Sequence, residues 1–203
     1  MRQAGGSSDA PRKVVFIGPY SSGKTSLIRR YSGEGFGEAQ ATVGLDFARL
    51  TNPLSGEVYL VWDTAGQERY SSVTPSYMRD ARVMVVVFDV TSDESWKSVP
   101  HWIHIARENG PKAVPVLVVG NKAEEADERA HPYETYETGA MSLGCGYMEA
   151  SSKTNYNVDR VFQSIFGIGS DGNTGRYNDD RGEVDLVIRD ARERSAFLCC
   201  IPS

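Results

Sequence analysis

The sequence predicts an α/β fold: a six-stranded, mostly parallel, doubly wound sheet with helices on both faces. Two near-continuous aliphatic runs, 83–89 and 114–120, are typical of strands that are buried on both faces. Helical segments alternate with the strands along the chain, as doubly wound sheets require. A length of 203 residues is enough for one such domain with a tail.

The first strand, 13–18, enters a glycine turn and is followed by a helix over 24–31. The next two strands, 45–52 and 57–63, are joined by the turn-forming residues 53–56, which indicates a hairpin. Further helices are predicted over 93–109, 133–143 and 158–166.

The composition changes after these elements. Residues 167–182 are rich in Gly, Asn, Asp and Ser, which predicts a flexible linker, and 184–188 form a small apolar island. We therefore expect a flexible N-terminus over 1–11, a globular domain over 12–166 and a flexible tail over 167–203.

Charge and cysteine content limit the class of protein. The net charge of -5 argues against a nucleic-acid binder, which normally carries a basic face. The three cysteines, two of them adjacent in the tail, do not form a disulfide framework and fit a reducing compartment. No apolar run approaches the roughly 18 residues of a membrane span. We expect a cytoplasmic domain that contacts membranes through its tail.

Residues 18–25 read Gly-Pro-Tyr-Ser-Ser-Gly-Lys-Thr and satisfy the pattern G-x-x-x-x-G-K-[ST] between a strand and a helix. The glycines let backbone N–H groups point at phosphates, and the helix adds its positive N-terminus. Lys24 is placed to reach the β- and γ-phosphates, and the Thr25 hydroxyl to bind Mg²⁺. The motif predicts a P-loop NTPase; the alternative is a chance glycine turn.

The segment 62–68, Trp-Asp-Thr-Ala-Gly-Gln-Glu, lies at the end of a predicted strand. Asp63 is placed to hold Mg²⁺, directly or through water, Gly66 to offer its N–H to the γ-phosphate, and Gln67 to orient an attacking water. Upstream, Thr42 supplies a hydroxyl that could complete the metal shell; its alternative is an exposed loop threonine.

Two further loops follow the fifth and sixth strands: Asn-Lys-Ala-Glu at 121–124 and Glu-Ala-Ser-Ser-Lys at 149–153. Ligands of doubly wound sheets bind just beyond the carboxyl ends of strands, so both loops are expected beside the phosphate loop.

These five motifs, in this order and spacing, resemble the Ras superfamily of GTPases over about residues 12–166. The segments 42–47, 59–70, 75–81 and 85–96 are most similar to the Rab branch, and the context of Tyr70 and Pro75 to endosomal Rabs. The resemblance implies a GTP/GDP switch with Mg²⁺ that hydrolyses GTP slowly and regulates vesicle trafficking by recruiting effectors to membranes.

The resemblance also implies residue roles. Phe36 would stack near the base, Asn121 and Lys122 would hold the base and ribose, and the loop 151–153 would offer N–H groups to guanine O6. Lys24 and Gln67 would be catalytic, and Thr25, Thr42 and Asp63 would bind the metal. The full nucleotide-binding set is Gly18, Ser21, Ser22, Gly23, Lys24, Thr25, Ser26, Phe36, Thr42, Asp63, Gly66, Asn121, Lys122, Glu124, Ser151, Ser152 and Lys153.

The implied partners are those of a Rab. They comprise an exchange factor, a GTPase-activating protein, effectors, and an escort protein or GDP-dissociation inhibitor, with the chain itself a monomer. Phe47, Trp62 and Tyr77 resemble the aromatic triad on which Rab effectors dock. Ordinary core packing is the alternative for these three side chains.

The sequence departs from the family pattern at three places. Tyr20 and Ser21 replace small residues near the γ-phosphate, where a tyrosine ring could obstruct the attacking water or an arginine finger. Glu124 replaces an aspartate, so the carboxylate that accepts from guanine lies one methylene further out. The segment 36–42 is about one residue short, so the first switch could close differently.

The tail resembles a Rab double-prenylation signal at Cys199 and Cys200. The last four residues also fit a C-a-a-X pattern, but proline suits its aliphatic slot poorly. From residue 167 the tail has five Arg and seven Asp or Glu, so no basic patch assists a single lipid, and two lipids are expected. The island 184–188 resembles the element that escort proteins grip; a nascent amphipathic turn is the alternative.

Three functions remain open from the sequence. The first is a cycling GTPase. The second is a nucleotide-locked, Rab-like scaffold that barely hydrolyses GTP, because of Tyr20 and Ser21. The third is an unrelated P-loop kinase, in which the segment 62–68 and the tail cysteines would have no role.

Overall fold

The computed structural model describes residues 10–34, 45–64, 74–171, 174–179 and 182–187. From β1 to α5, strands and helices alternate in the order that the sequence predicts. They are β1 (Arg12–Ile17), α1 (Lys24–Tyr31), β2 (Leu45–Thr51), β3 (Val58–Thr64), α2 (Thr74–Met78), β4 (Ala81–Asp89), α3 (Asp93–Asn109), β5 (Val116–Asn121), the short 3₁₀ helix η2 (Ala126–Glu128), α4 (Tyr133–Ser142), β6 (Gly146–Glu149), α5 (Val158–Asp171), β7 (Thr174–Asp179) and β8 (Gly182–Val187).

Six strands form the central sheet, in the order β2-β3-β1-β4-β5-β6. β2 and β3 pair as an antiparallel hairpin in which Phe47 lies opposite Trp62. All other neighbours in this sheet pair in parallel. The predicted hairpin and the predicted mixed, mostly parallel sheet are therefore confirmed.

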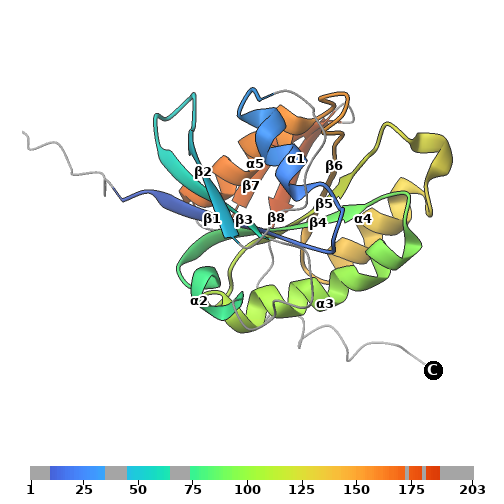
Figure 1. Cartoon of the computed structure of the whole chain (residues 1–203), viewed down its shortest axis with the longest axis horizontal. Helices are drawn as coiled ribbons and strands as arrows, with labels where there is room; N and C mark the ends of the chain where they lie inside the picture. Colours follow the sequence, from blue (N-terminus) through green and yellow to red (C-terminus); the bar gives the residue numbers. More distant parts are fainter. Residues whose placement is uncertain (1–9, 35–44, 65–73, 172–173, 180–181, 188–203) are drawn as a thin grey trace, which may run out of the picture.

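Helices cover both faces of the sheet. α1 and α5 lie on one face, and α2, α3 and α4 lie on the other (Figure 1). β1 shows why both faces are apolar, because successive side chains of a strand point to opposite sides. Phe16 is buried in the core beneath α1 and α5, whereas Ile17 is buried in the core beneath α3 and α4.

The longest helix, α3, begins and ends where the sequence predicts. The Ser92 hydroxyl caps it by accepting a hydrogen bond from the Ser95 N–H at 3.1 Å, and Asp93 and Glu94 place negative charge in its first turn. Among the described helices, none combines the length and the apolar composition needed to cross a membrane.

The region after residue 166 differs from its prediction. α5 continues to Asp171, because Ile168 is still buried and the Gly169 carbonyl accepts a hydrogen bond from Arg12 at 3.1 Å. β7 and β8 then pair as a separate antiparallel hairpin. We expected a linker over 167–182 and, as one alternative, a turn over 184–188; the described backbone forms a helix end and two strands instead. Strand pairing satisfies backbone groups regardless of a polar composition, which is why composition misses it.

Candidate functional site

The predicted site segments meet at one edge of the central sheet. Gly18 directly follows β1, Asp63 lies near the end of β3, Asn121 ends β5 and Glu149 ends β6. These positions are the carboxyl ends of strands that run parallel to one another, because β1 pairs in parallel with β3 and β5 pairs in parallel with β6. Doubly wound sheets bind their ligands at this edge.

The phosphate loop requires glycine at two positions. Gly18 has a φ of 139°, and a Cβ there would lie 2.1 Å from the Val87 carbonyl oxygen. Gly23, which caps α1, has a φ of 88°, and a Cβ would lie 2.1 Å from Asn121 Nδ2. Only glycine combines such dihedral angles with so close an approach. The loop therefore packs directly on β4 and on the end of β5.

Gly18→Ala is expected to destabilise the protein by about 3 kcal/mol, since it adds overpacking to an unfavourable φ. Gly56→Ala is the matched control: Gly56 also has a positive φ, 74°, but a Cβ there meets nothing within 4 Å. It should cost only about 1 kcal/mol. Urea unfolding of both variants measures the difference, and equal losses would contradict the close approach at Gly18.

Lys24 is buried within the phosphate loop. Its Nζ donates hydrogen bonds to the carbonyl oxygens of Gly18 at 3.0 Å and Pro19 at 2.9 Å, and lies 3.4 Å from Ser22 Oγ. Burial lowers the pKa of Lys24 to about 8, and the nearby Asp63 carboxylate partly offsets this. The loop thus curls around a cation, the arrangement that a bound polyphosphate needs.

Thr25 and Asp63 meet as the sequence predicts. The Thr25 hydroxyl donates to Asp63 Oδ2 at 2.5 Å. The end of β3 is held in place because the next residue, Thr64, donates its hydroxyl to the Phe16 carbonyl oxygen at 2.7 Å. A hydroxyl and a carboxylate side by side are hard oxygen donors of the kind that Mg²⁺ prefers. These two residues therefore fit a metal ion.

Several predicted site residues lie outside the described residues. They are Phe36, Thr42, Gly66 and Gln67 of the switch segments and Cys199 and Cys200 of the tail. Ser26 is described and lies in the first turn of α1, next to Thr25.

Asn121 joins the loops after β1, β5 and β6. Its Nδ2 donates to the Ser22 carbonyl oxygen at 2.9 Å, and its Oδ1 accepts from the Ser152 N–H at 3.2 Å. Lys122, with a φ of 66°, points its Nζ to Asp89 Oδ2 at 2.5 Å. The two predicted base loops are therefore in contact with each other and with the phosphate loop.

Glu124 carries a buried acceptor. Within the part of the chain that the structure describes, its Oε2 is buried and has no hydrogen-bond partner. Leaving a buried polar group without a partner costs about 1–3 kcal/mol. An acceptor of this kind, on the loop after β5, fits a ligand that brings its own N–H donors, as a guanine base does.

The two unusual phosphate-loop residues are solvent-exposed. Tyr20 is 57% exposed, and Ser21 has a φ of 60°, a left-handed conformation that costs a residue with a Cβ about 1–2 kcal/mol. An aromatic ring and a strained serine thus lie beside the place where phosphates would bind.

The three aromatic residues of the predicted effector surface differ in how far they are buried. The rings of Phe47 and Trp62 lie 5.4 Å apart, and Phe47 is 57% exposed. Trp62 and Tyr77 are partly buried against the core beneath α3 and α4. Core packing, the alternative from the sequence, is therefore wrong for Phe47.

Sequence reasoning missed residues that hold the base loops in place. Asp89 pairs with Lys122, and its position at the end of β4 could have indicated this. Arg129 donates to Glu149 Oε2 at 2.8 Å, and the Tyr147 hydroxyl donates to Glu149 Oε1 at 2.6 Å. No local pattern indicates the Arg129 contact, because its partner is 20 residues away.

The comparison with protein families agrees with this geometry. Residues 13–168 match the model of the Ras family, a span that runs from β1 into α5 and includes all the loops described above. This match excludes the third alternative from the sequence, an unrelated P-loop kinase. The chain belongs to the Ras family of small GTPases, molecular switches that bind guanine nucleotide with Mg²⁺, hydrolyse GTP and act through exchange factors, GTPase-activating proteins and effectors.

Proposed function

We propose that this GTPase is a Rab-like switch that regulates vesicle trafficking by recruiting effectors to membranes while it is bound to GTP. The observation that carries the proposal is the exposed Phe47 ring, which lies on Trp62 across the β2–β3 hairpin. A half-exposed aromatic side chain on a strand is typical of a docking surface, where aromatic residues are enriched. The Rab-like segments around it support the same reading.

The proposed nucleotide site uses the residues that meet at the sheet edge. Lys24 would hold the β- and γ-phosphates, Thr25 and Asp63 the metal ion, and Gln67 the attacking water, with Thr42 and Gly66 closing around the γ-phosphate. Bound Mg²⁺ would neutralise charge on the phosphate oxygens. The base would lie against the loops 121–124 and 151–153, with Phe36 beside it and Ser21, Ser22 and Ser26 near the phosphates.

The proposed tail carries two geranylgeranyl groups, on Cys199 and Cys200. Two lipids anchor a protein stably where one does so only marginally. The protein would then cycle between the cytosol and the cytosolic face of intracellular membranes, such as those of endosomes. An escort protein or GDP-dissociation inhibitor would cover the lipids while the protein is in the cytosol.

In vitro prenylation tests the Rab proposal. Geranylgeranyl transfer to the GDP-bound chain should require a Rab escort protein, and intact-mass measurement should show two added lipids. Cys199→Ser should reduce this to one. Lipid addition by a C-a-a-X prenyltransferase without escort protein, or no addition at all, would contradict the proposal while leaving the GTPase family in place.

A second candidate is a nucleotide-locked scaffold with the same surface but little GTP hydrolysis. The exposed Tyr20 ring and the strained Ser21 favour it. Single-turnover GTP hydrolysis, with and without an activating partner, separates the two candidates: a scaffold should show almost no product in either assay.

Guanine selectivity is expected although this chain has Glu124 where the family has an aspartate. A carboxylate complements two guanine donors, whereas adenine leaves the buried acceptor unpaired, so GDP should bind at least about a hundredfold more tightly than ADP. Competition binding measures this ratio. Glu124→Asp should tighten GDP if the longer side chain fits imperfectly, and comparable affinities for GDP and ADP would refute the assignment.

A further inference from the structure

Arg30 connects two loops of the proposed site that are far apart in sequence. It lies in the last turn of α1, the helix that begins at the phosphate loop. Its Nε donates to the Ser152 carbonyl oxygen at 2.7 Å, and its Nη2 donates to the Lys153 carbonyl oxygen at 2.7 Å. One guanidinium therefore donates hydrogen bonds to two consecutive carbonyl oxygens of the loop after β6.

These two hydrogen bonds set the orientation of the loop's peptide groups. In a trans peptide the carbonyl and the following N–H point in opposite directions. Because the Ser152 carbonyl points to Arg30, the Lys153 N–H points away from it. Two further hydrogen bonds fix the N–H groups of this loop. The Ser152 N–H donates to Asn121 Oδ1 at 3.2 Å, and the Thr154 N–H donates to Ser151 Oγ at 2.9 Å.

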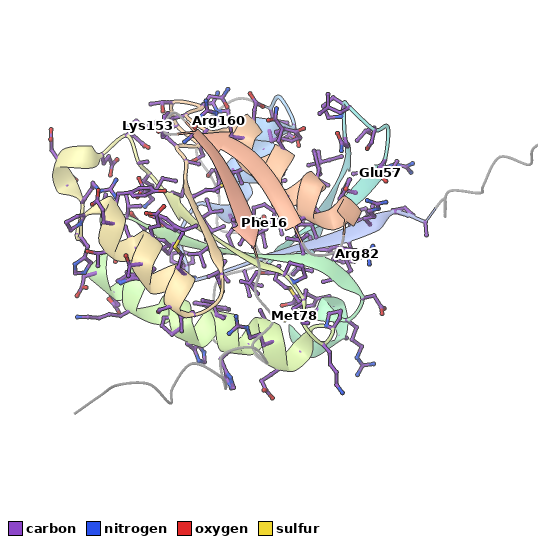
Figure 2. The ribbon with its side chains drawn as sticks, turned by 180° about the vertical axis from the view of Figure 1, so that it is seen from behind. Phe16, Glu57, Met78, Arg82, Lys153 and Arg160 are labelled. Carbon is purple, nitrogen blue, oxygen red and sulfur yellow. The ribbon has the colours of Figure 1, made fainter. Side chains whose placement is uncertain are left out.

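The contact needs an arginine. The planar guanidinium presents two parallel donors in a fixed fork, while a lysine ammonium is a single point charge on a flexible chain. Figure 2 shows Lys153 at the end of the molecule where the loop leads into α5, far from Glu57 at the β2–β3 turn. The Arg30 guanidinium therefore links α1 to the loop after β6 at the end of the molecule where the nucleotide is proposed to bind.

We propose that Arg30 is a positioning residue: it couples the phosphate-loop helix to the base loop, so that the loop 151–153 holds the C6 carbonyl of guanine and the nucleotide is released slowly. The proposal rests on the proposed role of this loop in binding the base. Arg30 acts through the peptide groups of the loop and does not itself touch the nucleotide.

The first test compares GDP dissociation from Arg30→Ala, Arg30→Lys and Arg29→Ala with the parent, using fluorescent GDP in the presence of Mg²⁺. Arg29 is the matched control, because it is the neighbouring arginine and, within the part of the chain that the structure describes, its side chain makes only an exposed pair with Glu34 at 3.9 Å. We expect release to be about tenfold faster from Arg30→Ala, the loss of about 1.4 kcal/mol, intermediate from Arg30→Lys and unchanged from Arg29→Ala.

The second test separates positioning from general destabilisation by using two analogues. Inosine diphosphate keeps the C6 carbonyl, whereas the diphosphate of 2-aminopurine riboside lacks it. Arg30→Ala should weaken GDP and inosine diphosphate by the same factor and leave the 2-aminopurine nucleotide almost unaffected. Equal weakening of all three would show that Arg30 only stabilises the fold.

The outcomes also distinguish this inference from the function beneath it. A parent protein that binds ADP as well as GDP would refute the base-loop assignment and the inference together. A guanine-selective parent whose Arg30→Ala variant releases GDP at the parental rate would refute the inference alone. If Arg30→Ala does not fold, the GDP dissociation rate of Arg30→Lys is the deciding measurement. A rate equal to that of the parent would show that the planar guanidinium is not required and would overturn the inference.

Discussion

Adding EDTA to the GDP-bound protein is expected to lower its melting temperature by roughly 10 °C. Nucleotide held with Mg²⁺ at a thousandfold excess over its dissociation constant stabilises the native state by about 4 kcal/mol. For a chain of this size each kcal/mol corresponds to about 2–4 °C. The residues through which the ligand would stabilise the protein are described in the structure. Lys24 is a buried cation that a phosphate would neutralise, and Thr25 and Asp63 form a close pair that a metal ion would bridge.

Thermal melting by circular dichroism measures this shift. The same sample with EDTA followed by excess MgCl₂ and GDP is the control, and it should regain the original melting temperature. EDTA with a large excess of GDP should give an intermediate value, because nucleotide can still bind weakly without the metal. An unchanged melting temperature under EDTA would contradict a metal-dependent nucleotide site.

The parts of the fold that the sequence predicts are those encoded by local pattern. Aliphatic runs such as Val85–Val87 of β4 are buried on both faces, so hydrophobicity alone identifies the strand. α3 carries its own start signal in Ser92 and its acidic first turn, and its bounds match the prediction. The phosphate loop is equally local, because Gly18 to Gly23 join β1 to α1, and Lys24 and Thr25 are the first residues of that helix.

The contacts that the sequence does not predict join residues that are distant along the chain. Arg30 and Ser152 are 122 positions apart, and no periodicity relates them. The β7–β8 hairpin is missed for a different reason: β7 has the polar composition of a linker, and the short apolar island in β8 does not by itself indicate a strand, yet the two backbones pair. Glu124 could be recognised as a departure from a motif, but only the structure reveals that its Oε2 is buried without a partner among the described residues.

Tyr20→Gly is expected to raise the GTP hydrolysis rate in the presence of an activating protein by about 10³-fold, with a smaller effect on the basal rate. An arginine finger contributes about 10³–10⁵ in rate when it reaches the γ-phosphate. The Tyr20 ring is on the surface of the phosphate loop and is 57% exposed. We expect it to obstruct the path that such a finger would take. The parent should therefore hydrolyse slowly and respond poorly to activation.

Tyr20→Phe and Ser21→Gly are the matched controls in single-turnover assays. Tyr20→Phe keeps the ring and loses only its hydroxyl, so it should behave like the parent. Ser21→Gly relieves a φ of 60° without clearing the ring, so it should stabilise the loop but leave activation poor. If Tyr20→Gly matches the parent in both basal and activated assays, the ring is a bystander. The nucleotide-locked scaffold would then lose its main support, and the cycling GTPase would be the favoured candidate of the two.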